Sequence, residues 1–152
     1  MRPRRALCMI AIDTNILVYA HRPHLDAHAR CRSAIEDLVR SGTRFAEPWP
    51  RLHEFIGVVT NARVFAPPAP VDAAVAFVDD FAALARCQFL GETTRHLAVL
   101  ADLMRTPGVT GSRVNDARIA AICLTHGVSE LWTADRVFSY FPRLRTRNPI
   151  VA

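Results

Sequence analysis

Short, unbroken apolar runs recur along this chain between longer segments of helical period, and this alternation constrains the fold more than any other feature. The first run, Leu7 to Ile12, is apolar at every position, which is typical of a central parallel strand covered on both faces. Further strands are predicted at residues 44–46, 87–90 and 130–133, with an edge strand at 144–147. Helices are predicted at residues 14–20, 24–40, 50–61, 71–84, 94–105 and 114–126. Strands alternating with helices predict an α/β fold with a mostly parallel sheet.

The chain has the length of one domain. Its 152 residues, 51% of them hydrophobic, are enough to bury a substantial core, and neither a repeat nor a linker divides the sequence. Residues 1–8 form a basic lead-in to the first strand and are interpreted as a flexible extension or an over-extended start. Because no apolar run approaches the roughly 18 residues of a membrane span, we expect one cytoplasmic domain over residues 1–152.

Every basic residue of the chain is an arginine. The formal net charge is +5 with 19 basic side chains, and lysine is absent. Arginine binds phosphate groups in a bidentate manner and keeps its charge, which favours a polyanionic partner, although GC-rich codon usage also explains the choice of arginine over lysine. The lack of lysine excludes a phosphate-binding P-loop. The four cysteines are widely spaced, so they are interpreted as free thiols.

Four acidic residues occupy positions that favour convergence. Asp13 and Asp135 stand at or just past the ends of predicted strands, and the carboxyl ends of strands border the ligand-binding crevice of open α/β sheets. Asp116 falls in the first turn of its helix, where free N–H groups and the macrodipole favour an anion. Glu54 lies near the edge of the apolar face of its helix.

Carboxylates gathered in this way repel one another unless a cation joins them. Oxygen-only ligation suits Mg²⁺ or Mn²⁺, and such a cation can activate water and stabilise the charge on a phosphate. Each acid taken singly also has a purely structural explanation. Asp13 can be a helix N-cap, Asp116 a dipole partner, Glu54 a solvated helix residue and Asp135 a turn former.

Four ordered motifs carry a family resemblance. They are Ile-Asp-Thr-Asn-Ile-Leu-Val-Tyr at 12–19, His-Glu-Phe at 53–55, Asn-Asp-Ala-Arg-Ile-Ala-Ala at 115–121 and Leu-Trp-Thr-Ala-Asp-Arg-Val-Phe at 131–138. In order, spacing and total length the chain resembles the PIN-domain family, and within it the VapC-type toxins of bacterial toxin–antitoxin pairs. The resemblance implies a three-layer α/β/α fold, Mg²⁺- or Mn²⁺-dependent endoribonuclease activity and a cognate antitoxin partner.

The resemblance also implies roles for individual residues. Asp13 and Asp116 match direct metal ligands, whereas Glu54 and Asp135 match acids that complete the site. Polar positions that support the acids in the family are matched by Asn15 and Thr133. One departure stands out: Val137 replaces a further acid often found in the last motif, which makes Asp135 more dependent on its neighbours.

Three arginines close to the acids in sequence, Arg113, Arg118 and Arg136, are candidates to anchor flanking phosphates of RNA, although a solvated surface charge is the simpler explanation of each. Two other functions stay open at this point. One is a non-catalytic PIN-like module that binds RNA or a partner protein; the other is a nuclease that acts on DNA. The apolar helices between His24 and Leu84 could supply a groove for an antitoxin helix and a homodimer surface.

Overall fold

In the computed structural model, which describes residues 8–151, the strands form one sheet whose neighbours all run parallel. The strands are β1 (Met9–Ile12), β2 (Arg44–Pro48), β3 (Cys87–Leu90), β4 (Glu130–Trp132) and β5 (Thr146–Arg147), in the order β3-β2-β1-β4-β5. On one side of β1 the sheet continues through β2 to β3, and on the other side it continues through β4 to β5. The strand order therefore reverses at β1, which is the position where such sheets bind ligands.

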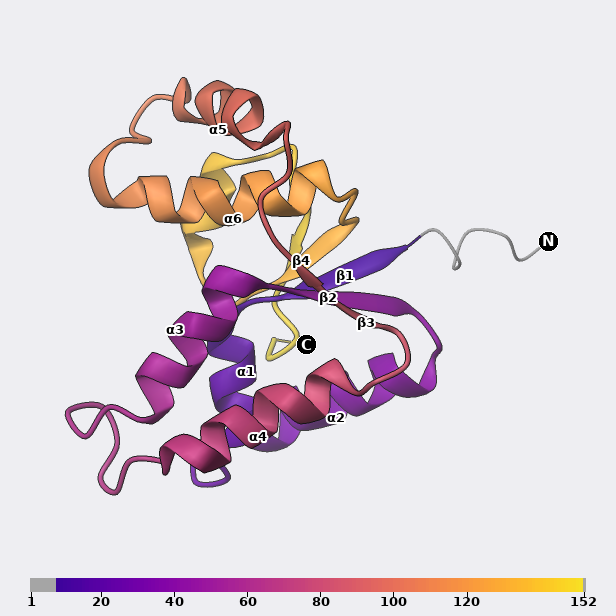
Figure 1. Cartoon of the computed structure of the whole chain (residues 1–152), viewed down its shortest axis with the longest axis vertical. Helices are drawn as coiled ribbons and strands as arrows, with labels where there is room; N and C mark the ends of the chain where they lie inside the picture. The colour runs from indigo at the N-terminus through magenta and orange to yellow at the C-terminus, as the bar shows by residue number, and fades with distance from the viewer. Residues whose placement is uncertain (1–7, 152) are drawn as a thin grey trace.

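Helices cover both faces of this sheet, as Figure 1 shows. One face carries α1 (Thr14–His21), α2 (His28–Arg40), α3 (Trp49–Val59) and α4 (Val71–Ala82); the other carries α5 (His96–Met104) and α6 (Val114–Thr125). Two short 3₁₀ helices, η2 (Gly111–Arg113) and η3 (Arg136–Tyr140), precede α6 and follow β4. The expected three-layer α/β/α fold with a parallel sheet is confirmed.

The alternation of side chains along the strands divides the core into two halves. In β1, Met9 and Ala11 pack with α5 and α6, whereas Ile10 and Ile12 pack with the helices of the opposite face. All four side chains are buried, as the unbroken apolar run predicted. Cys31 and Cys123 are buried within the two halves, and all the cysteines are free, in agreement with their interpretation as thiols.

The element boundaries differ from the expected ones mainly at helix ends. The helix expected from His24 starts at His28, because Arg22 is extended before Pro23 and the chain then forms turns over residues 23–27. The strand expected at 44–46 extends to Pro48, which brings Glu47 into the sheet. The predicted extension at residues 1–8 falls almost wholly outside the described residues. None of the helices within residues 8–151 combines the length and apolar character that a membrane span needs.

Candidate active site

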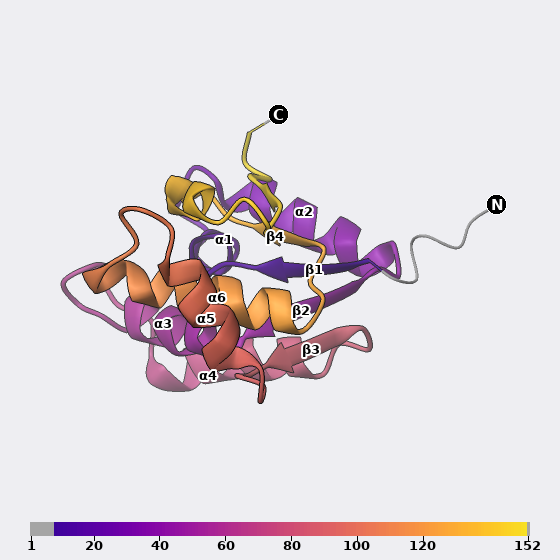
Figure 2. The same cartoon turned by 90° about the horizontal axis from the view of Figure 1, so that it is seen from above.

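The carboxyl edge of the sheet gathers the predicted acidic residues, and Asp13 lies at its centre. Figure 2 shows β1 running toward the edge from which α1 leaves. Asp13 follows β1 directly, and its backbone N–H donates to the carbonyl of Trp132 at the end of β4 (2.9 Å). Its Oδ1 accepts the backbone N–H of Thr14 at 2.9 Å, so Asp13 also caps α1. The residue is only 3% exposed. Asp13 is therefore a helix N-cap, as its structural explanation predicted, and its role as a metal ligand stays a prediction.

The two polar residues predicted to support the acids lie beside Asp13. The hydroxyl of Thr133, at the end of β4, donates to Asp13 Oδ2 (2.7 Å) and accepts the backbone N–H of Asp135 (3.0 Å). Asn15 Oδ1 accepts the backbone N–H of Ala134 (3.3 Å). Together these contacts tie the turn after β4 to the start of α1.

A cation of the chain itself, the guanidinium of Arg51, brings three of the four predicted acids together. Its Nε lies 3.0 Å from Asp13 Oδ1, and its Nη2 lies 3.3 Å from Asp116 Oδ1. Its Nη1 pairs with Glu54 Oε2. The Nε contact is an ion pair whose angle does not satisfy hydrogen-bond geometry. Since Asp13, Glu54 and Asp116 come from the end of β1, from α3 and from α6, the structure confirms that these acids converge.

Glu54 is fixed from two sides. Besides its pairing with Arg51 three residues earlier on α3, its Oε2 accepts the hydroxyl of Thr14 at 3.1 Å. That hydroxyl also lies 3.1 Å from the Arg51 carbonyl oxygen, so the first turn of α1 is joined to the first turns of α3. The side chain of Glu54 is 46% exposed, which leaves it open to solvent and to a ligand.

Asp135 lies at the margin of the site. The residue is exposed, and its Oδ1 accepts the backbone N–H of Val137 at 2.9 Å, which caps η3. Its carboxylate does not join the ion pairs around Arg51, although its charge contributes to the raised pKa of Asp116. In this structure the Asp135 carboxylate therefore stabilises a turn, and its role as a metal ligand stays a prediction.

Removal from water dominates the pKa values of Asp13 and Asp116. Burial raises the pKa of Asp13 above its ordinary range even though Arg51 and the Thr133 hydroxyl act in the opposite direction. Burial likewise raises the pKa of Asp116, against the effect of Arg51. For Arg51, burial acts to lower the pKa, but the surrounding carboxylates outweigh it and the pKa is raised. The attraction of one guanidinium therefore does not offset the effect of burial on these two carboxyl groups.

The three arginines predicted to contact RNA have different surroundings. Arg113 stacks over the Tyr140 ring (4.3 Å) and donates to the Gly108 carbonyl (2.7 Å). Arg118 pairs with Glu92 across the gap between α6 and the end of β3. Arg136 is exposed at the start of η3, next to Asp135. Contact with RNA remains a prediction for all three.

Sequence reasoning missed two residues of this region. Arg51 stands three residues before Glu54, a spacing that favours an ion pair on a helix, so its pairing with Glu54 could have been found. Its contacts with Asp13 and Asp116 depend on the tertiary fold. Glu47 is completely buried in β2, and both its carboxylate oxygens lack a hydrogen-bond partner among the described residues. Burial, followed by the charge of Asp13, raises the pKa of Glu47 well above its ordinary value.

The chemistry of the convergent side chains fits a hard divalent cation. They supply carboxylate oxygens, the ligands that Mg²⁺ and Mn²⁺ prefer, and they already surround a positive group. As the side chains stand, however, no group of three or more acidic, histidine or cysteine residues within residues 8–151 is close enough together to hold a metal ion. The donor set therefore fits such a cation, but Arg51 occupies the space between the carboxylates.

Comparison with known proteins agrees with this fold. The family model described as "PIN domain" matches residues 10–144. The chain is similar to ribonuclease VapC43 of Mycobacterium tuberculosis, with 37% identity over 142 residues that cover 93% of this chain and 96% of the relative. It is also similar to ribonuclease VapC33 of the same species, with 29% identity and coverage of 93% and 99%.

Solved structures share the fold at lower sequence identity. VapBC2 from Rickettsia felis, bound to a DNA fragment from its promoter, superposes with a TM-score of 0.66 at 22% identity, covering 92% of this chain and 98% of that one. VapC20 of M. tuberculosis, a toxin that cleaves the sarcin-ricin loop, gives a TM-score of 0.61 at 15% identity, with 86% and 92% covered. The family model and the solved structures agree on a PIN fold that covers most of the chain. The chain belongs to the PIN domain family, among the VapC ribonucleases.

Proposed function

We propose that this protein is an endoribonuclease that depends on Mg²⁺ or Mn²⁺ and acts as the toxin of a toxin–antitoxin pair. One observation supports this most strongly: Asp13, Glu54 and Asp116, from three separate elements, meet around the Arg51 guanidinium at the carboxyl edge of the sheet. The relatives of the chain are named ribonucleases, which identifies RNA as the substrate class to test first.

Different residues of the site would have different roles in such a reaction. Asp13 and Asp116 would hold the metal, with Glu54 and Asp135 completing its surroundings. When bound, the metal would activate water and stabilise the charge that develops on the phosphate. Thr133 orients the Asp13 carboxylate through the bond to its Oδ2, and the Thr14 hydroxyl orients Glu54. Exposed arginines around the site, among them Arg136, would attract and position the RNA backbone.

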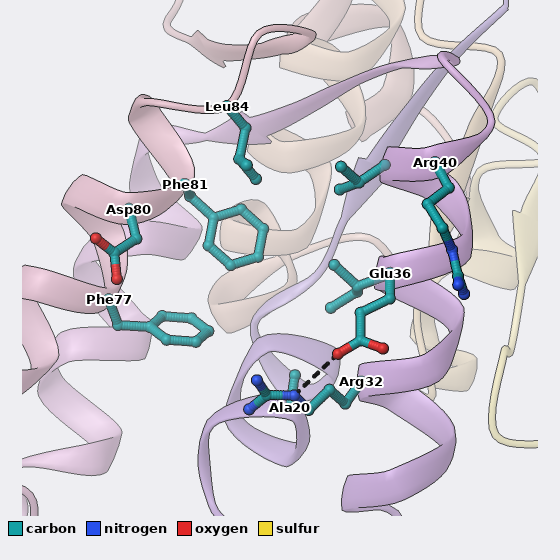
Figure 3. A pocket seen from close by; sticks show the side chains of 10 residues that line it. Ala20, Arg32, Glu36, Arg40, Phe77, Asp80, Phe81 and Leu84 are labelled. Atoms are coloured by element: carbon teal, nitrogen blue, oxygen red, sulfur yellow. Dashed lines mark hydrogen bonds and ion pairs between the residues drawn. The ribbon is translucent and has the colours of Figure 1, made fainter.

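The antitoxin would bind in a groove between two helices that cover one face of the sheet. The groove has a volume of about 580 Å³ and lies between α2 and α4, with Ala20 of α1 at its floor. Figure 3 shows Phe77, Phe81 and Leu84 facing this space, with charged side chains along its rim. An apolar groove with rim charges of both signs suits an amphipathic helix with its own charged flanks. Apart from Ala20, the lining residues fall within the helices between His24 and Leu84 that the sequence indicated as a partner surface.

Cleavage of RNA by the metal-stripped protein, after addition of one metal at a time, tests the proposed activity. We expect single-stranded RNA to be cut with Mg²⁺ or Mn²⁺, with loss of cutting in EDTA and recovery after excess metal is restored. DNA of the same sequence and a structured RNA, measured in parallel, separate a ribonuclease from the DNA nuclease alternative. Intact RNA under every metal condition would contradict the proposal and favour the non-catalytic binding module.

A further inference from the structure

Arg51 is held inside the site rather than at its margin. Its side chain is only 12% exposed, although arginine is normally a surface residue. All three nitrogens of the guanidinium face a carboxylate, those of Asp13, Glu54 and Asp116. The Phe138 ring closes off another side, with its centroid 5.8 Å from Cζ. Arg51 is thus placed as a counterion of the acids.

The backbone fixes this placement. Arg51 lies in the first turn of α3, directly after Pro50, and its carbonyl oxygen lies 3.1 Å from the hydroxyl of Thr14. Because Thr14 follows Asp13, this contact sets Arg51 and Asp13 beside one another. A side chain anchored so close to its partner carboxylates loses little conformational freedom when it pairs with them, which favours the metal-free arrangement.

The same carboxylate oxygens cannot serve the guanidinium and a metal ion at once. Asp13 Oδ1 and Asp116 Oδ1 face Arg51 at 3.0 and 3.3 Å, whereas Mg²⁺ requires its oxygen ligands at roughly 2.0–2.1 Å. In the part of the chain that the structure covers, no group of three or more acidic, histidine or cysteine side chains could hold a metal ion as it stands, and Arg51 lies between the acids. Two cations in the same space would also repel each other strongly.

We propose that Arg51 is an internal cation that competes with the divalent metal for Asp13 and Asp116. In the metal-free protein it holds the carboxylates together and limits their repulsion, and it withdraws from both aspartates when the metal binds. Arg51 therefore stabilises the metal-free fold and weakens metal affinity. This inference rests on the metal dependence put forward in the proposed function and adds a residue that regulates it.

Calorimetric titration of the metal-stripped full chain with Mg²⁺ and with Mn²⁺, in the absence of RNA, tests this competition. Arg51→Met keeps the length of the side chain and removes its charge, so we expect metal affinity to rise on the order of tenfold or more. The melting temperature of the metal-free protein should fall, and the rise in melting temperature on metal addition should be larger than in the wild type. Arg118→Met is the matched control, because it removes the same charge from a residue paired with Glu92.

The metal affinities of the variants decide whether Arg51 competes with the metal. Metal affinity that is equal or weaker in Arg51→Met, or raised to the same extent in Arg118→Met, overturns the inference. If Arg51→Met does not fold, Arg51→Gln is measured instead, and Arg51→Lys should restore weak metal binding because it restores the charge. If neither the wild type nor any variant binds Mg²⁺ or Mn²⁺, the metal dependence of the proposed function fails together with the inference. Tight binding by the wild type with no effect of Arg51 overturns the inference alone.

Discussion

The hydroxyl of Thr133 lies 2.7 Å from Asp13 Oδ2, so two residues 120 positions apart in sequence share one hydrogen bond at the ends of neighbouring strands. The bond exists because β1 and β4 are parallel and paired, with Ile12 opposite Trp132. Because the hydroxyl binds Oδ2, Oδ1 of Asp13 remains available for the Thr14 N–H and for Arg51. The bond also orients a carboxylate whose pKa is raised by burial.

Thr133→Val should therefore reduce cleavage without removing any acid. The change keeps the shape of the side chain but deletes the donor to Asp13 and the acceptor for the Asp135 N–H. We expect a roughly 10- to 100-fold loss of cleavage rate and a loss of about 1 kcal/mol or more in unfolding free energy. Thr133→Ser keeps the hydroxyl and should retain most of the rate. RNA cleavage and urea unfolding of the three proteins measure both effects; a Val variant as active as the wild type would remove Thr133 from the site.

Asp116→Asn and Asp135→Asn should differ sharply in their effect on cleavage. Asp116 contacts Arg51 at the centre of the site, whereas Asp135 caps η3 at its margin. We expect Asp116→Asn to lower the cleavage rate by on the order of a hundredfold to a thousandfold or more, and Asp135→Asn to lower it less.

Both proteins should remain folded. In Asp135→Asn the introduced amide oxygen can still accept the Val137 N–H, and in Asp116→Asn the changed side chain is only partly buried. Asp37→Asn, which changes an exposed acid of α2, serves as the control. Circular dichroism establishes folding and an RNA cleavage time course gives the rates. Equal losses for Asp116→Asn and Asp135→Asn would show that both acids hold the metal directly.

The sequence was sufficient to predict that β1 ends directly before Asp13, and hence the edge of the sheet at which the acids gather. An apolar run that stops at Asp13 is a local signal, and parallel strands place their carboxyl ends at one edge irrespective of detailed packing. The family resemblance indicated Thr133 as a support for the acids, and the pairing of β1 with β4 places it beside Asp13. What could not be predicted is how the space among the acids is filled, because that depends on the angle at which α3 leaves β2.

Glu47 illustrates a second limit. A glutamate followed by Pro48 and Trp49 resembles a strand end or a loop, so the sequence does not predict that Glu47 is part of a strand. Burial of an unpaired carboxyl group also costs free energy, which makes such a position unexpected for a glutamate. The strand continues through it because Glu47 pairs in register with Phe89 of β3. Its burial has a measurable consequence for stability.

Stability should fall as the pH rises above about 4.5, the ordinary pKa of glutamate, because of Glu47. Its pKa is raised in the folded protein, so between 4.5 and the folded pKa the folded state binds more protons than the unfolded state. The destabilisation by Glu47 is absent below pH 4.5, where its carboxyl group is neutral in the folded and the unfolded state, and it grows as the pH rises. Glu47→Gln removes it, so the difference in unfolding free energy between variant and wild type should grow by up to about 1.4 kcal/mol per pH unit.

Urea unfolding at several pH values between roughly 4 and 8 measures this difference. Glu36→Gln provides the control, because it removes a carboxylate that is more than half exposed. Asp13 also has a raised pKa and contributes to the slope of every variant, so only the difference between Glu47→Gln and the wild type is informative. Parallel curves for these two proteins would show that Glu47 has the same pKa in the folded and unfolded states.

The groove between α2 and α4 gives the last prediction, on antitoxin binding. Val39 lines this groove and is 37% exposed, so Val39→Asp places a charge in the groove without opening a cavity in the core. We expect a roughly 10- to 100-fold weaker complex with the cognate antitoxin, since the charge must be desolvated when an apolar helix face covers it, while RNA cleavage by the free toxin stays unchanged. Val75→Asp is the matched control, because Val75 lies on α4 with 48% exposure and does not line the groove. Surface plasmon resonance with the cognate antitoxin measures both affinities. If the two variants bind the antitoxin equally, its helix is seated elsewhere on the toxin.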